Sequence, residues 1–215
     1  GIIPKVVGII PVSNSYVYHF GEPFQTLNNK PLLWYTLNQA SESLLLDKVV
    51  VATDDTEVKE YVKKHFNQFI IIDRPAGLSA ANIKMYEILK FTLEQLEVNH
   101  DYTPEAVCTL YINTPLRKAK HIDKSIDTMQ VFNVDTVISV QEELAFCYHH
   151  RKFGLEPINK SRLVRKERNA IYKENSAIFL SKVETIKGGL LTGENVGHIT
   201  MLPEESIKIT TAYDL

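Results

Sequence analysis

The chain has 215 residues, and its 24 lysines and arginines nearly balance its 26 aspartates and glutamates, which leaves a formal net charge of −2. This balance argues against a nucleic-acid-binding protein, because such proteins carry a strongly basic face. Hydrophobic residues make up 44% of the chain, with nine glycines and nine prolines. The composition is therefore that of a globular protein with one core, which excludes disordered, collagen-like and low-complexity chains.

Membrane insertion and a disulfide framework are also disfavoured. No apolar run approaches the roughly 18–20 residues that span a bilayer, and the first apolar stretch is too short for a signal peptide. We therefore expect a soluble cytoplasmic protein with no membrane contact. The two cysteines, Cys108 and Cys147, lie in apolar stretches without metal-ligand spacing, so buried thiols are expected.

Strands and helices alternate regularly over the first 140 residues. Short continuous apolar runs predict strands buried on both faces of a sheet, at 6–11, 48–53, 69–72, 106–112 and 136–140. Apolar residues at helical spacing predict helices between them, over 33–44, 56–66, 85–96 and 122–129. This order predicts an α/β fold with a mostly parallel sheet covered by helices on both faces.

Two helix starts carry capping signals. Asn28 and Asn29 are expected to cap the first helix, with Pro31 in its first turn. Asp54 and Asp55 follow the second strand. They resemble a paired-carboxylate site, but capping of the next helix is the simpler interpretation.

The pattern changes between 141 and 174. A weakly alternating stretch that includes His149 and His150 is followed by a Phe153-Gly154 turn. Adjacent strand residues point to opposite faces, so the two histidines are not expected to chelate one ion. Four basic residues follow: Arg162, Arg165, Lys166 and Arg168. They could bind a carboxylate or the partner subunit, or they could simply be solvated side chains. We interpret 141–174 as a protruding hairpin or arm of a single domain that spans 1–215.

Strands at 176–180 and 198–201, with a short helix at 183–187, are expected to complete the sheet. Ligands of open α/β sheets bind at the carboxyl ends of the strands. The connection after the first strand, 12–23, is long, contains one glycine and lacks lysine and arginine, so it is unlike a phosphate-binding loop. Its aromatic residues, Tyr16, Tyr18 and Phe20, are explained equally by stacking on a base, by filling the pocket or by packing against a neighbouring subunit.

Six segments occur in a distinctive order: IIP at 9–11, KPLL at 30–33, DKVVVATDD at 47–55, RPAGL at 74–78, TPLR at 114–117 and YKENSAI at 172–178. Together they resemble the acylneuraminate (CMP-sialic acid) cytidylyltransferase family. The resemblance implies a Rossmann-like nucleotidyltransferase, built as a three-layer sandwich. It also implies a homodimer held partly by the arm at 141–174, and Mg²⁺-dependent transfer of CMP from CTP to the anomeric hydroxyl of a nonulosonic acid.

The chain departs from the motifs of that family where they meet phosphate and metal. The family's first loop reads I-P-A-R-x-G-S-K, and its two phosphate-binding cations fall on Ser13 and Val17. The family's metal-binding D-I-D falls on 208–210, where Lys208 and Thr210 replace the carboxylates, and the glutamine before T-S-P-L-R is replaced by Tyr111. Because CMP transfer depends on charge neutralisation at the phosphates, these changes imply that the activity is lost or strongly impaired.

We therefore expect an altered nucleotide or sugar-acid pocket with no assigned catalytic residue or metal ligand, formed by Ser13, Asn14, Ser15, Arg74, Asn113, Arg117, Lys208 and Thr210. Lys208 is either a surface lysine or a fixed cation in place of the Mg²⁺ ion. Two alternatives stay open. One is an active nucleotidyltransferase for another nucleotide or sugar acid, with Lys208 and Arg117 as its cations. The other is a non-catalytic assembly or regulatory partner that pairs through the arm.

Overall fold

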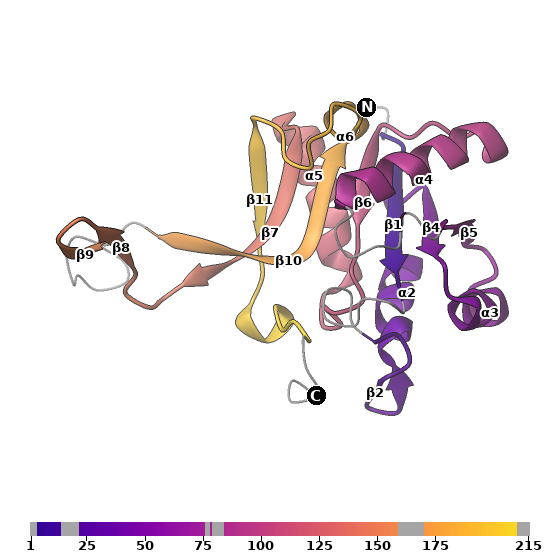
Figure 1. Ribbon diagram of the computed structural model, residues 1–215, viewed down its shortest axis with the longest axis horizontal. Helices are drawn as coiled ribbons and strands as arrows, with labels where there is room; N and C mark the ends of the chain where they lie inside the picture. The colour runs from indigo at the N-terminus through magenta and orange to yellow at the C-terminus, as the bar shows by residue number, and fades with distance from the viewer. Residues whose placement is uncertain (1–3, 14–21, 76–77, 79–83, 159–169, 210–215) are drawn as a thin grey trace.

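A computed structural model describes residues 4–13, 22–75, 78, 84–158 and 170–209 (Figure 1). A seven-stranded sheet runs through the body in the order β11-β7-β10-β6-β1-β4-β5. Its strands are β1 (Val6–Val12), β4 (Lys48–Thr53), β5 (Ile70–Asp73), β6 (Ala106–Thr109), β7 (Thr136–Glu143), β10 (Ile171–Lys182) and β11 (Val196–Thr200). β10 is antiparallel to both neighbours, β6 and β7, and the other neighbouring pairs are parallel. The predicted α/β fold with a mostly parallel sheet is confirmed.

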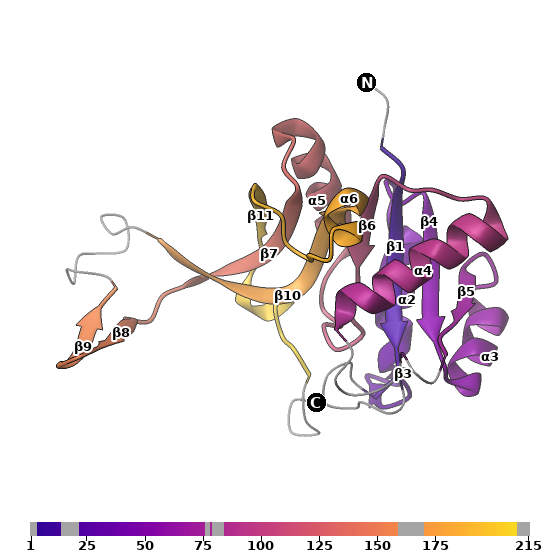
Figure 2. The same cartoon turned by 45° about the horizontal axis from the view of Figure 1, so that its top comes forward.

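Helices cover both faces of this sheet. They are α2 (Leu32–Glu42), α3 (Thr56–His65), α4 (Met85–His100), α5 (Ala119–Phe132) and α6 (Val183–Lys187), with a short 3₁₀ helix η3 (Pro203–Glu205) near the carboxyl end. Every residue of β1 is buried. Val6 and Ile10 pack with α2, α3 and α5, whereas Val7 and Ile9 pack with α4 and α6. Figure 2 shows α4 lying across one face of the sheet, with α2 behind the sheet.

The start of α2 differs from the prediction. Asn28 and Asn29 have φ values of 49° and 65° and form the turn of a small hairpin between β2 (Thr26–Leu27) and β3 (Lys30–Pro31). They therefore do not cap the helix. Pro31 occupies the N-cap position without a side-chain cap. Leu44, the last residue of the predicted helix, lies beyond the end of α2 and is 88% exposed. Asparagine tolerates the left-handed conformation well, which explains why it served the turn here rather than the cap.

The start of α3 agrees with the sequence. The Asp55 side chain accepts hydrogen bonds from the backbone N–H groups of Glu57 and Val58, at 2.9 and 3.3 Å. Asp55 is therefore the helix cap, and the capping interpretation of this carboxylate is confirmed.

β7 and β10 are longer than their apolar runs predict, because they continue beyond the body as a paired ribbon. The ribbon leads to the hairpin of β8 (Tyr148–Arg151) and β9 (Gly154–Pro157), which projects far from the sheet (Figure 1). β6 is shorter than predicted and ends at Thr109, after which the chain turns toward α5. The basic residues between 162 and 168 lie outside the described residues.

The two cysteines differ in environment. Cys108 lies in β6 with no exposed surface, and burial raises the pKa of its thiol to about 12. Cys147 is only half-buried, because it lies in the arm, directly before β8. Burial was thus predicted correctly for Cys108 alone. Across the residues that the structure describes, no helix has the length and apolar character to cross a bilayer.

The regular pairing of β7 with β10 is interrupted between Glu174 and Phe179, where Ser176 has a φ of 59°. A left-handed conformation costs a residue with a Cβ atom about 1–2 kcal/mol, and glycine avoids that cost. We expect Ser176→Gly to raise the free energy of unfolding by up to about 1 kcal/mol, after allowance for the greater freedom of glycine in the unfolded chain. Urea denaturation measures the change. Ala177→Gly, at the next residue, is the control and should be destabilised; a similar loss in Ser176→Gly would contradict the strain argument.

Candidate functional site

The carboxyl ends of β1, β4, β5 and β6 meet at one edge of the sheet, which we call the strand-end edge. Ser13 follows β1, Arg74 follows β5, and Asn113 lies four residues beyond the end of β6. Backbone hydrogen bonds hold these ends together. The Arg74 N–H donates to the Thr53 carbonyl at 3.1 Å, and the Leu110 N–H donates to the Ile9 carbonyl at 2.9 Å. Ser13 is fully buried at this edge.

Arg74 is a buried cation at this edge, with 4% of its surface exposed. One Nη atom donates to the Val12 carbonyl oxygen at 3.2 Å and lies 3.9 Å from a carboxylate oxygen of Asp54. Burial lowers the pKa of Arg74, and the negative charge of Asp54 opposes that effect. Its Nε atom is buried and has no hydrogen-bond partner among the described residues. The guanidinium is therefore held mainly by the chain beneath the edge.

Arg117 is buried more completely, with 1% of its surface exposed. Its Nη atoms donate to the Thr114 hydroxyl at 2.6 Å, the Ala177 carbonyl at 2.8 Å, the Thr36 hydroxyl at 3.0 Å and, at 3.3–3.5 Å, the Tyr111 carbonyl. Burial lowers its pKa to about 10. These contacts join α2, the loop after β6 and β10. Because its Nη donors are engaged with protein oxygens, Arg117 is a structural cation and does not face a ligand.

Lys208 comes to the same edge by a backbone contact. The N–H of Ile209 donates to the Asn113 carbonyl at 2.7 Å, and the Ile209 side chain is buried in the core. Lys208, by contrast, is exposed. Tyr111, which stands where the family has glutamine, is half-buried, and burial together with the charge of Glu174 raises its pKa to about 12.

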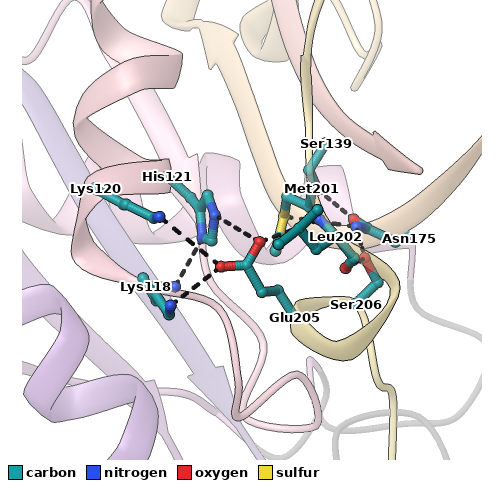
Figure 3. A network of polar contacts seen from close by, with 9 residues as sticks. All are labelled: Lys118, Lys120, His121, Ser139, Asn175, Met201, Leu202, Glu205 and Ser206. Atoms are coloured by element: carbon teal, nitrogen blue, oxygen red, sulfur yellow. Dashed lines mark hydrogen bonds and ion pairs between the residues drawn. The ribbon is translucent and has the colours of Figure 1, made fainter. Parts of the chain in front are cut away.

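Figure 3 shows a polar network that fixes the chain just before Lys208. Glu205, at the end of η3, is 6% exposed. Its carboxylate lies 3.3 Å from the Lys118 ammonium and 3.5 Å from His121 Nε2, and accepts the Leu202 N–H at 3.1 Å. The 4.0 Å contact to Lys120 is longer. These contacts bind η3 to the start of α5.

The contacts of Glu205 and His121 determine how the pKa of each is shifted. Burial would raise the pKa of Glu205, but the Leu202 hydrogen bond and the charges of Lys118 and His121 outweigh it and lower the pKa. Burial lowers the pKa of His121; Glu205 opposes that effect, and Lys118 and Lys120 add to it. The His121 Nδ1 atom accepts the Lys118 backbone N–H at 2.9 Å, so the neutral imidazole carries its proton on Nε2, toward Glu205.

Asn175 forms the second half of the network. Its amide oxygen accepts from the Ser139 hydroxyl and, at 3.1 Å, from the Ala177 N–H. Its amide nitrogen donates to the Ser206 hydroxyl at 2.9 Å and approaches the Met201 sulfur at 3.5 Å. Asn175 therefore fastens the segment before Lys208 to β7 and β10 (Figure 3).

A family model described as cytidylyltransferase matches residues 21–200. The chain belongs to the cytidylyltransferase family. An N-acylneuraminate cytidylyltransferase from Streptococcus agalactiae is 26% identical over 74% of the chain and 39% of the relative. A bifunctional Helicobacter pylori protein named as a pseudaminic acid cytidylyltransferase and UDP-2,4-diacetamido-2,4,6-trideoxy-β-L-altropyranose hydrolase is also 26% identical, over 74% of the chain and 31% of its own length. The chain thus spans well under half the length of these relatives.

Solved structures confirm the nucleotidyltransferase fold. The 4-diphosphocytidyl-2C-methyl-D-erythritol synthase of Anaerococcus prevotii aligns with a TM-score of 0.71 at 15% identity, over 98% of this chain and 92% of that one. A CMP:2-keto-3-deoxy-manno-octonic acid synthetase complexed with CTP aligns with a TM-score of 0.67 at 13% identity, over 97% and 94% of the two chains.

The predicted pocket of this cytidylyltransferase-family chain is only partly described. Ser13, Arg74, Asn113 and Lys208 lie at the strand-end edge, and Arg117 lies beneath it. Asn14, Ser15 and Thr210 fall outside the described residues, as do Tyr16, Tyr18 and Phe20. The pairing of His121 with Glu205 was not predicted from the sequence. These residues are 84 positions apart in the sequence. Neither belongs to a local sequence motif, so no sequence pattern predicts their contact.

The described residues of this cytidylyltransferase-family chain do not suit Mg²⁺, which prefers carboxylate and phosphate oxygens. Asp54 faces Arg74, Asp55 caps α3, Asp73 pairs with Lys59, and Glu205 pairs with Lys118. Lys208, at the position where the resemblance implies a metal-binding carboxylate, carries a positive charge instead. Within the described part of the chain, no three His, Cys, Asp or Glu side chains form a metal-binding group.

The network around Glu205 gives a pH prediction for this cytidylyltransferase-family chain. The pKa of His121 is lowered in the folded state, so the unfolded chain binds more protons and stability falls as pH drops below about 6.5, the ordinary histidine value. The lowered pKa of Glu205 acts in the same direction at lower pH, below its ordinary value. Urea midpoints at about pH 7.5 and about pH 5.5 bracket the histidine range.

His121→Asn is the comparison variant for that measurement, because an asparagine oxygen can accept the Lys118 N–H without titrating. We expect the midpoint of the wild type to fall more steeply with acidification than that of His121→Asn. Parallel changes in the two proteins would show that His121 does not contribute to the pH dependence.

Proposed function

We propose that this chain is a CMP-nonulosonate (sialic acid type) cytidylyltransferase-like protein whose CMP transfer from CTP is lost or strongly impaired. Sequence relatives that include N-acylneuraminate and 3-deoxy-manno-octulosonate cytidylyltransferases support the substrate class. The observation that carries the loss is the set of residues at the reacting positions. Ser13 and Val17 stand where the family has cations, and Lys208 and Thr210 stand where it has metal-binding carboxylates.

The geometry of the described residues supports this proposal. Ser13 is fully buried, and a hydroxyl there supplies no positive charge. Arg117 cannot substitute as a phosphate cation without leaving the oxygens of Thr36 and Ala177, which would then be buried without that donor. Arg74 is held in the same way by the Val12 carbonyl. Removing one preorganised donor typically lowers a rate by about 10²–10³, so the absence of two cations and a metal site predicts a loss of several orders of magnitude.

A pyrophosphate-release assay tests this proposal. The chain is incubated with CTP and Mg²⁺ and, in turn, with N-acetylneuraminate and 3-deoxy-manno-octulosonate, beside the Streptococcus agalactiae relative as a positive control. We expect release by this chain to remain at the background of the reaction without protein. Release above background that Arg74→Ala abolishes would show an active transferase and overturn the proposal. Other nucleoside triphosphates in the same assay detect an active enzyme of different specificity.

We also propose that the chain forms a homodimer through the arm at 141–174, as its family resemblance implies. The hairpin of β8 and β9 supports this with apolar residues that have no cover within the described chain. Phe153 is 95% exposed and Leu155 is 68% exposed. Leu155 lies opposite His150, and Tyr148 lies opposite Pro157, so these four residues share one face. An exposed apolar face on a projecting element is typical of an interaction site.

Light scattering coupled to size-exclusion chromatography tests the dimer. We expect the wild type to be dimeric at micromolar concentration and Leu155→Asp to be monomeric, because the substitution places a charge in the apolar face. Val98→Asp is the control, since Val98 is 78% exposed but lies on α4, in the body. A monomeric wild type, or an equal effect of the two substitutions, would refute an interface at the arm.

A further inference from the structure

The charged side chains at the strand-end edge differ in whether they already have a partner within the protein. Three described carboxylates at or beside this edge have partners: Asp54 faces Arg74, Asp73 pairs with Lys59 and Glu205 pairs with Lys118. Lys208, in contrast, is exposed. Two buried guanidiniums, Arg74 at the edge and Arg117 beneath it, add fixed positive charge that is only partly balanced by Asp54. An anion approaching this edge therefore meets the exposed Lys208, and also the charge of Glu174, which is exposed and acts on Tyr111.

The position of Lys208 is fixed by the residues around it. Ile209 anchors the following residue to the core and to the Asn113 carbonyl at 2.7 Å. Ser206 anchors the preceding turn through Asn175 at 2.9 Å and through the Leu202 carbonyl at 2.7 Å. The backbone on both sides of Lys208 is thus held, and the backbone that carries it lies beside the loop after β6. Little backbone ordering would be needed for it to meet a ligand.

We infer that the strand-end edge binds the phosphate groups of a cytidine nucleotide without a divalent metal ion, with the Lys208 ammonium taking the place of that ion. The inference rests on the proposed function, since it assumes a nucleotide-binding relative that has left metal-assisted transfer. A lysine ammonium is a compact point charge with three donors and is well suited to phosphate oxygens. It also repels a cation at the same place.

This arrangement reverses the usual role of Mg²⁺. Here Mg²⁺ would compete with Lys208 for the same phosphate oxygens and reduce the charge of the nucleotide. Free CTP should therefore bind more tightly than its Mg²⁺ complex. The uncharged nucleoside cytidine lacks the phosphates, so its binding should respond to neither Mg²⁺ nor Lys208.

Calorimetric titration of the intact chain with CTP tests this inference, first in EDTA and then in excess MgCl₂. We expect CTP to bind about tenfold more tightly in EDTA, and Lys208→Ala to weaken binding in EDTA about tenfold, the size expected for one hydrogen bond to a charged group. Lys208→Asp should reverse the preference, so that Mg²⁺ strengthens binding. Cytidine, titrated in parallel, should bind equally to the wild type and Lys208→Ala.

Lys187→Asp is the matched control, because Lys187 is also exposed but lies at the end of α6, beyond the opposite edge of the sheet. It should bind CTP as the wild type does. Thermal unfolding of each variant checks that the fold is kept, as expected for substitutions at exposed positions. Binding that requires Mg²⁺ in the wild type, binding that Lys208→Ala leaves unchanged, or no binding of CTP in EDTA would each overturn the inference.

These outcomes are separate from those of the proposed function. A chain that binds CTP only with Mg²⁺ and releases no pyrophosphate overturns the metal-free site and leaves the loss of transfer intact. A chain that binds free CTP but also releases pyrophosphate with Mg²⁺ overturns the loss of transfer and leaves the Lys208 site intact.

Discussion

The buried guanidinium of Arg117 joins α2 to the central strands, because its donors reach the Thr36 hydroxyl and the Ala177 carbonyl as well as the loop after β6. A cation without a carboxylate partner is costly to bury unless its donors are satisfied. Here neutral oxygens from three separate parts of the chain satisfy its Nη atoms. These parts must come together for the arginine to be accommodated, so the site depends on this contact for the placement of the loop that carries Asn113.

A second constraint acts from the carboxyl-terminal side. Asn175 binds Ser206, and Glu205 binds the start of α5 (Figure 3), so η3 is held between the antiparallel strand β10 and the helix that follows Arg117. These contacts decide where the chain runs next. Lys208 therefore reaches the strand-end edge because of residues that have no direct part in ligand chemistry.

The sequence predicts the fold well where the signal is local. The buried runs of β1 and β4 and the Asp55 cap depend on neighbouring residues, and the structure has them as expected. The prediction fails at Asn28 and Asn29, because asparagine serves both a helix cap and a left-handed turn and only the hairpin partner decides between them. It is also silent on the pairing of His121 with Glu205, which depends on the completed sheet.

The structural roles of the motif residues limit what the family resemblance says about activity. Several residues that match the family motifs have structural work in this chain: Arg117 and Asn175 satisfy buried oxygens and amides, and Pro31 begins α2. Residues with such roles stay compatible with the fold whether or not transfer occurs. Lys208, by comparison, is exposed between anchored neighbours, so the fold places little demand on its side chain. A change of charge at such a position alters the chemistry of the edge with little structural consequence. The fold and the family can therefore be retained while the reaction changes.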